Sequence, residues 1–138
     1  MVVIKASVQI GALQDRVWDI VSDLDREPEF WKGTKSVRNI SRNGNRVVRE
    51  VTIAFKDKKC MQEITLEPRN RIAVEFTEGI ILGSKSIALR GGGDGTTLEA
   101  RWDITMSGMM GIFTGMIKKH IRSGTEQALY AIKEKAEG

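Results

Sequence analysis

Few side chains in this sequence could do acid–base or metal chemistry. His120 is the only histidine and Cys60 the only cysteine. The sequence therefore offers no multi-histidine metal site and no clear Ser-His-Asp triad, and no closely spaced ligand motif brings carboxylates to either residue. It predicts no metal and no cofactor. His120 and Arg49 are catalytic candidates only if the protein is an enzyme.

His120 belongs to a stretch with helical periodicity. On a helical wheel it lies about 20° from Phe113 and about 40° from Gly124, at the edge of an apolar arc. A histidine in this place can be an edge residue that hydrogen-bonds to a sheet backbone or to water. Alternatively, it can exchange a proton with a ligand carbonyl or phenol.

Two polar residues share the inward phase of apolar strands. Arg49 stands among valines, and Gln62 stands between Cys60 and Ile64. A buried arginine without an anion is costly, so a functional Arg49 would meet a ligand carboxylate or an internal glutamate. Otherwise, Arg49 is a strand-end residue that reaches solvent. Gln62 is either a ligand contact or a core amide satisfied by the backbone.

The element that must position several of these residues is a long helix at the end of the chain. Apolar residues at three- and four-residue steps share one arc of it: Met110, Phe113, Ile117, Ile121, Gly124, Ala128 and Ile132. A helix from Met109 to Ala136 would be roughly 40 Å long at about 1.5 Å per residue. Its apolar stripe needs a partner of similar length.

Alternating segments before this helix predict that partner, an antiparallel sheet. The expected strands are Ile4–Ile10, one with Val37 and Ile40, Val47–Phe55, Lys59–Leu66, Arg71–Thr77, Ile80–Leu89 and Thr97–Met106. Two short helices follow the first strand, one over Leu13–Leu24 and one from about Pro28 to Gly33. The GGGDG run at 91–95 looks like a phosphate loop, but an alternating strand follows it, so we expect a hairpin turn.

The sheet is expected to curl. One helix about 10 Å wide cannot cover seven strands spaced about 4.8 Å apart, so the sheet must wrap around the helix and leave space between them. The inward phase collects Val47, Val51, Ile53, Ile64, Leu66, Ile72, Val74, Phe76, Leu98, Trp102 and Ile104. The expected fold class is α+β, with the C-terminal helix across the concave face of a seven-stranded antiparallel sheet.

This order of elements resembles the START-like (SRPBCC) superfamily, which includes the polyketide cyclase/dehydrase and lipid-transport group. The stretches that carry the resemblance are VWDIVSD at 17–23, PEFW at 28–31 with the following Val37, and the ending at 128–137. The resemblance covers the whole chain and implies a helix-grip fold with a deep apolar cavity. It does not fix one activity, because members bind lipids, quinones, hormones or polyketides, and some interact with other proteins.

In such a fold, inward-facing residues of helix and sheet would contact the ligand. The expected contacts are Trp31, Arg49, Gln62, Phe76, Trp102, Phe113, Ile117, His120 and Gly124. Glycine costs helix stability, so Gly124 indicates space for a ligand or for a close strand. The Met- and Gly-rich segment 108–116 predicts a pliable mouth or close helix–sheet packing. Phe30 and Trp31 would line the opposite side of the mouth, bind a partner or anchor the core.

Composition and charge limit the number of domains, the partners and the location that the sequence allows. The chain has 138 residues and a net charge of +4, which fits one domain over residues 1–138. Its basic residues are dispersed among acidic ones, so nucleic acid is an unlikely partner. No apolar run approaches the roughly 20 residues of a membrane span, although transient membrane contact stays open. The alternating start and the single cysteine favour the cytoplasm. A monomer and a homodimer are both compatible with the sequence.

Three functions remain open at this stage. The leading hypothesis is a non-catalytic binder or carrier of a small hydrophobic molecule, such as a lipid, a quinone or a polyketide-like compound. The second is an enzyme of the cyclase/dehydratase type that uses His120 or Arg49. The third is a protein-interaction module built on the segment around Phe30 and Trp31. Catalysis needs convergent ionisable groups, and the sequence offers few, which favours binding.

Overall fold

The computed structural model describes residues 2–107 and 114–138. In chain order, its elements are β1 (Val2–Ile10), α1 (Gln14–Val21), the 3-10 turn η1 (Leu24–Arg26), α2 (Glu27–Phe30), β2 (Thr34–Asn43), β3 (Arg46–Ile53), β4 (Lys59–Glu67), β5 (Arg71–Gly79), β6 (Ile81–Gly92), β7 (Gly95–Met106) and α3 (Thr114–Glu137). The predicted α+β class is confirmed: a seven-stranded antiparallel sheet, short helices after β1 and a long C-terminal helix.

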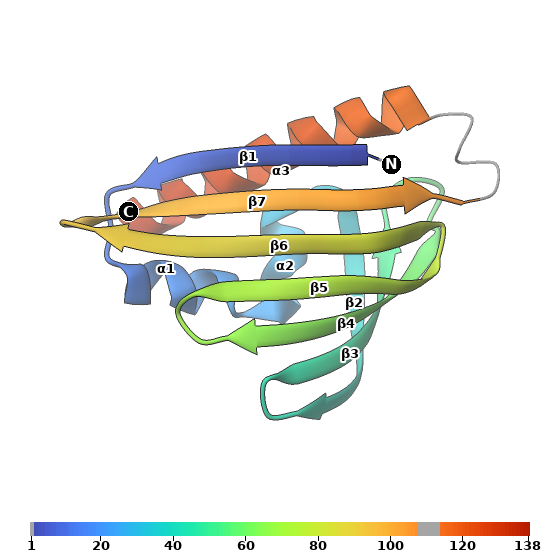
Figure 1. Ribbon diagram of the computed structural model, residues 1–138, viewed down its shortest axis with the longest axis horizontal. Coiled ribbons are helices and arrows are strands. Elements are labelled where there is room, and N and C mark those ends of the chain that lie inside the picture. Colours follow the sequence, from blue (N-terminus) through green and yellow to red (C-terminus); the bar gives the residue numbers. More distant parts are fainter. Residues whose placement is uncertain (1, 108–113) are drawn as a thin grey trace.

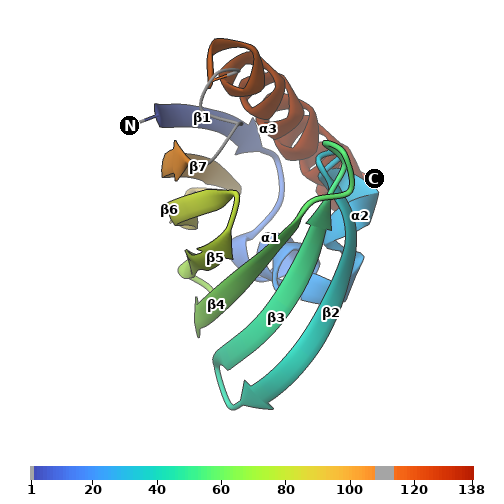
Figure 2. The same cartoon turned by 90° about the vertical axis from the view of Figure 1, so that its right-hand side faces the viewer.

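The strands form one sheet in the order β1-β7-β6-β5-β4-β3-β2. Strands β2 to β7 are a meander, and β1 returns to pair with β7 from Val2↔Ile104 to Ile10↔Thr96. The expected hairpin at the glycine run is confirmed, because Gly92 pairs with Gly95 and Gly93 adopts a φ of 61°. Figures 1 and 2 show that the sheet curls from β7 round to β2, with α3 running beside β1.

The inward phase predicted for the strands is the buried phase. Residues of β3, β4 and β5 alternate between buried and more exposed positions. The core includes Val47, Val51, Ile64, Leu66, Ile72, Val74, Phe76, Leu98, Trp102 and Ile104, while Ile53 is half-buried. The convex side carries the polar phase, so one face of the sheet supplies most of the core.

The short helices differ from the expected boundaries. The predicted helix Leu13–Leu24 ends at Val21, and Leu24 begins the separate turn η1. Pro28 lies in the first turn of α2, where its missing N–H costs nothing, as predicted. This helix ends at Phe30 rather than near Gly33, and Trp31 follows with φ −98° and ψ 98°. The extended backbone at Trp31 begins the approach to β2.

The long helix has two unlike halves. Its C-terminal half is tightly packed, with Ala128, Leu129 and Ile132 at most 2% exposed. Its N-terminal half buries Ile117 but leaves His120 exposed. The helix is described from Thr114 onwards, so residues 109–113 of the predicted helix lie outside the described part. The sequence predicted one continuous buried stripe; the structure shows that only part of it meets the sheet closely.

Contacts with the start of the chain hold the C-terminal end of α3 in place. The Glu137 Oε2 atom accepts hydrogen bonds from Gly11 N at 2.7 Å and from Lys133 Nζ at 2.6 Å. The guanidinium of Arg16 donates to the carbonyl of Lys135 at 3.0 Å, near the negative end of the helix dipole. These contacts fix the end of the helix that lies away from the cavity described next.

Candidate ligand-binding cavity

A cavity of about 430 Å³ lies between the curled sheet, the α2–β2 connection and the N-terminal half of α3. This volume is in the range of about 300–1,000 Å³ that small-molecule sites occupy. Its lining residues from the sheet are Thr34, Val51, Ile53, Gln62, Phe76, Ile81, Lys85 and Trp102. Most of this wall is apolar.

The cavity opens between three segments. Exposed lining residues come from the α2–β2 connection (Lys32 and Gly33), from the chain after β3 (Ala54) and from α3 (His120, Ser123 and Gln127). The Met- and Gly-rich segment predicted as a mouth falls largely on residues 108–113, which lie outside the described residues. The mouth that the structure does describe lies one to three turns further along α3.

The structure brings most of the predicted contact residues together. Those that line the cavity are Trp31, Gln62, Phe76, Trp102, Ile117, His120 and Gly124. Arg49 does not line it, and Phe113 lies outside the described residues. At Gly124 an added Cβ would meet no heavy atom within 4 Å. Gly124 therefore faces open space and not a close strand.

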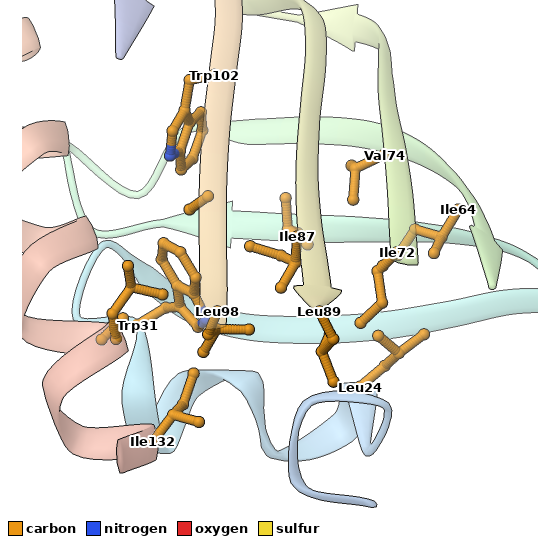
Figure 3. Close-up of a cluster of buried hydrophobic side chains, with 14 of the residues drawn as sticks. Leu24, Trp31, Ile64, Ile72, Val74, Ile87, Leu89, Leu98, Trp102 and Ile132 are labelled. Atoms are coloured by element: carbon orange, nitrogen blue, oxygen red, sulfur yellow. The ribbon is translucent and has the colours of Figure 1, made fainter. Parts of the chain in front are cut away.

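Aromatic rings form one side of the cavity. Phe76 and Trp102 stack with ring centroids 5.9 Å apart and an interplanar angle of 18°. Trp31 meets Trp102 edge to face at 6.2 Å. Figure 3 shows Trp31 and Trp102 on the α3 side of the buried cluster. The indole N–H of Trp102 donates to Thr125 Oγ1 at 3.0 Å, which ties β7 to α3 and fixes the ring.

Arg49 is fully enclosed behind the cavity wall, with an exposure of 1%. Its guanidinium donates to Gln62 Oε1 at 2.9 Å, to the Leu24 carbonyl at 3.2 Å and to Glu27 Oε1 at 2.5 Å. The alternative of a strand-end residue reaching solvent is therefore wrong, and the anion it meets is an internal glutamate. Arg49 supports the cavity because Glu27 and Gln62, which it orients, both line it.

Glu27 is held ionised by its neighbours. Its side chain is 13% exposed, and Thr34 Oγ1 donates a second hydrogen bond to it at 2.8 Å. Burial alone would raise the pKa of this carboxyl, but the charges of Lys85 and Arg49 and the hydrogen bonds from Arg49 and Thr34 outweigh it and keep the pKa below the ordinary value. The carboxylate therefore balances one of the two buried cations.

The second cation, Lys85, was not identified from the sequence. It lies on β6 opposite Trp102 of β7 and is 6% exposed. Its Nζ is 3.4 Å from the centroid of the Trp31 ring and 4.6 Å from that of Trp102, both cation–π contacts. Burial lowers the pKa of this amine to about 8; Glu27 counteracts the effect and Arg49 adds to it.

A sequence signal for Lys85 was present. Lys85 has the same phase as Ile81, Ile87 and Leu89, all of which are buried. The inward residues predicted from the sequence include none from this strand, so Lys85 was not among the candidates. Arg49 was recognised because a charged residue occupied the inward, apolar phase of its strand. The same criterion identifies Lys85.

His120 stands at the mouth of the cavity. It is exposed, and no described residue forms a hydrogen bond or ion pair with its side chain. We expect His120→Ala to change the free energy of unfolding by less than about 0.5 kcal/mol, measured by urea denaturation, because the site is on the surface. If the protein is an enzyme that uses this imidazole, the same variant loses turnover. A clear loss of stability would instead assign His120 a structural role.

Metal-binding clusters and membrane-spanning helices are both absent from the described part of the chain. Among residues 2–107 and 114–138, no group of three or more His, Cys, Asp or Glu side chains is placed to hold a metal ion. None of the helices in these two ranges combines the length and hydrophobicity that crossing a membrane requires.

A curled sheet that grips a C-terminal helix over an apolar cavity defines a helix-grip protein. Residues 10–130 match the family described as polyketide cyclase/dehydrase and lipid transport, so the chain belongs to that family. Among curated proteins, none matches the sequence significantly. The resemblance stated from the sequence is thereby confirmed at the level of the family.

Solved structures of low sequence identity share the fold. A protein from Thermus thermophilus is 18% identical with a TM-score of 0.84, over 97% of this chain and 96% of that one. The Zhui aromatase/cyclase from a Streptomyces species is 16% identical with a TM-score of 0.80, over 98% and 93%. A START superfamily protein from Mycobacterium smegmatis is 16% identical with a TM-score of 0.70, over 96% and 99%.

Proposed function

We propose that the protein binds, and as a carrier releases, a small hydrophobic molecule in the cavity beneath the N-terminal half of α3. The observation that carries the proposal is an aromatic-lined cavity of about 430 Å³ that opens to solvent. Membership of a family that includes lipid-transport proteins and polyketide cyclases supports it. A lipid, a quinone or a polyketide-like compound fits such a lining, because burial of apolar surface supplies most of the binding free energy.

The other two functions are less favoured by the geometry. A cyclase or dehydratase would use Arg49 or His120 on its substrate. However, the Arg49 guanidinium donates to Leu24, Glu27 and Gln62, and His120 lies at the mouth of the cavity. For an interaction module, Trp31 is turned inward and only 9% exposed. Turnover of a poly-keto substrate by the purified protein would move the assignment from binder to enzyme.

The position of Gly124 gives a direct test. Gly124→Leu places a side chain in the cavity, so we expect the affinity for the neutral dye N-phenylnaphthylamine to fall at least about tenfold, or about 1.4 kcal/mol. The free energy of unfolding should hold or rise, because leucine is a better helix former and fills a void. Dye fluorescence measures the first quantity, and thermal denaturation measures the second.

Gly115→Leu is the matched control. Gly115 lies on the same helix, an added Cβ there also meets nothing within 4 Å, and the residue does not line the cavity. It should leave dye binding unchanged. Dye binding that is unaffected in Gly124→Leu, or absent in the unmodified protein, would contradict the proposed function.

A further inference from the structure

The cavity wall carries one buried positive charge without a counterion of its own. Arg49 and Glu27 form an ion pair, whereas Lys85 has no ion pair within 4.0 Å among the described residues. Nor does a described residue accept a hydrogen bond from its ammonium group. The buried cluster of Glu27, Arg49 and Lys85 therefore has an excess of one positive charge at neutral pH.

This arrangement is costly for a ligand-free protein. A buried ammonium loses its hydration, and indole faces replace only part of it. A structural lysine at this position would be expected to have its own carboxylate partner, as Arg49 does. Lys85 instead lines the cavity beside Trp31 and Trp102, where a ligand can approach its side chain.

We propose that Lys85 is the anchor for an anionic oxygen, and that the ligand of the cavity is a hydrophobic carboxylic acid. The carboxylate would take the place of the missing counterion at Nζ. The apolar part would lie along Trp102 and Phe76, towards the open space at Gly124. This inference rests on the proposed binding function and narrows it to one class of ligand.

The charge distribution also predicts what the cavity rejects. A hydrophobic amine would bring a third cation to a cluster that already has an excess positive charge. A neutral alcohol of the same length would gain the apolar contacts without the charge-assisted hydrogen bond. The differences in affinity among ligands of equal length therefore test the role of Lys85. The affinity that all of them share tests hydrophobic binding in the cavity.

The test is displacement of bound N-phenylnaphthylamine by decanoate, decanol and decylamine at about pH 7. We expect decanoate to displace the dye at concentrations about tenfold lower than decanol, with decylamine weakest. In Lys85→Met, decanoate and decanol should become equivalent. Lys5→Met is the control, because Lys5 is an exposed lysine on β1 that does not line the cavity; it should keep the preference for decanoate.

A pH series on the unmodified protein provides a second readout that needs no variant. Burial lowers the pKa of Lys85 to about 8, and decanoate stays ionised well above the ordinary carboxyl pKa of about 4.3. Its affinity should therefore fall about tenfold, to that of decanol, as the pH rises from about 7 to about 9.5. The other ionisable groups facing the cavity cluster are Glu27, Arg49 and, at the mouth, Lys32 and His120; the variants Lys32→Met and His120→Ala control for the last two.

The outcomes separate the two proposals. Equal displacement by decanoate and decanol in the unmodified protein would overturn the carboxylate site and leave hydrophobic binding intact. A preference for decanoate that persists in Lys85→Met would also overturn it. If neither the dye nor decanoate, decanol or decylamine binds, the result would instead contradict the proposed function itself.

Discussion

Replacing Glu27 with glutamine is expected to lower the free energy of unfolding at neutral pH by about 3–5 kcal/mol. Glutamine keeps the size of the side chain but removes the carboxylate paired with Arg49, which is 1% exposed. Two buried cations would then remain without a counterion. Urea denaturation of both proteins measures the difference.

Glu67→Gln serves as the control for this prediction. Glu67 is paired with Arg71 on the surface, where both side chains are 51% exposed, and such pairs contribute less than about 1 kcal/mol. The folded pKa of Glu27 lies below the ordinary 4.5. Its contribution is therefore complete above that pH and is lost as the pH falls through the folded value, so the two curves should converge in acid. Equal effects of the two substitutions would show that the buried pair is not a determinant of stability.

The fold could be predicted because its periodicities are strong. The alternating strands left one apolar face, and the mismatch between a seven-strand sheet and one helix required curvature. The turns were equally clear, as at Gly93. The boundaries of the short helices were less predictable. The boundary between α1 and η1 depends on the burial of Leu24 in the core, a tertiary contact that local helix propensity does not include.

The pairing behind the cavity could not be predicted. Arg49 was recognised as a buried charge in need of an anion, but Glu27 comes 22 positions earlier in the chain. The two meet only because α2 docks under the curl of the sheet. Nothing in the spacing of α2 residues marks Glu27 rather than Glu29, which is exposed, as the partner.

The two halves of α3 explain how one apolar arc can serve both core and cavity. Ala128 and Ile132 pack against the sheet, while Gly124 faces space. In the sequence these residues belong to the same arc, and periodicity cannot say how far the sheet lies from each turn. The sequence therefore identified cavity residues such as Trp102 and Ile117 without locating the cavity along the helix.

The cavity combines an unpaired buried charge with apolar walls, so it should cost stability in return for binding. We expect Lys85→Met to raise the free energy of unfolding of the ligand-free protein at about pH 7 by about 3 kcal/mol. Burial holds the pKa of Lys85 at about 8 against an ordinary 10.5, and each pKa unit corresponds to about 1.4 kcal/mol. Methionine keeps much of the side-chain length and needs no counterion. The melting temperature should rise by several degrees.

The dependence on pH identifies the cause. Below about pH 8, Lys85 is charged in the folded protein and the full cost is present. As the pH rises from about 8 to 10.5, the unfolded chain stays protonated while the folded chain does not, so the unmodified protein gains stability relative to Lys85→Met. The advantage of the variant should therefore shrink over this range.

Lys5→Met, at an exposed position outside the cavity, should change stability by less than about 0.5 kcal/mol over the same pH range. Saturating decanoate should narrow the stability advantage of Lys85→Met by about 1.4 kcal/mol, because ligand stabilisation grows with the logarithm of affinity and the unmodified protein binds decanoate about tenfold more tightly. If Lys85→Met were destabilised without ligand, the ammonium would be serving the fold through its two indole contacts. The buried charge would then need no ligand to explain it.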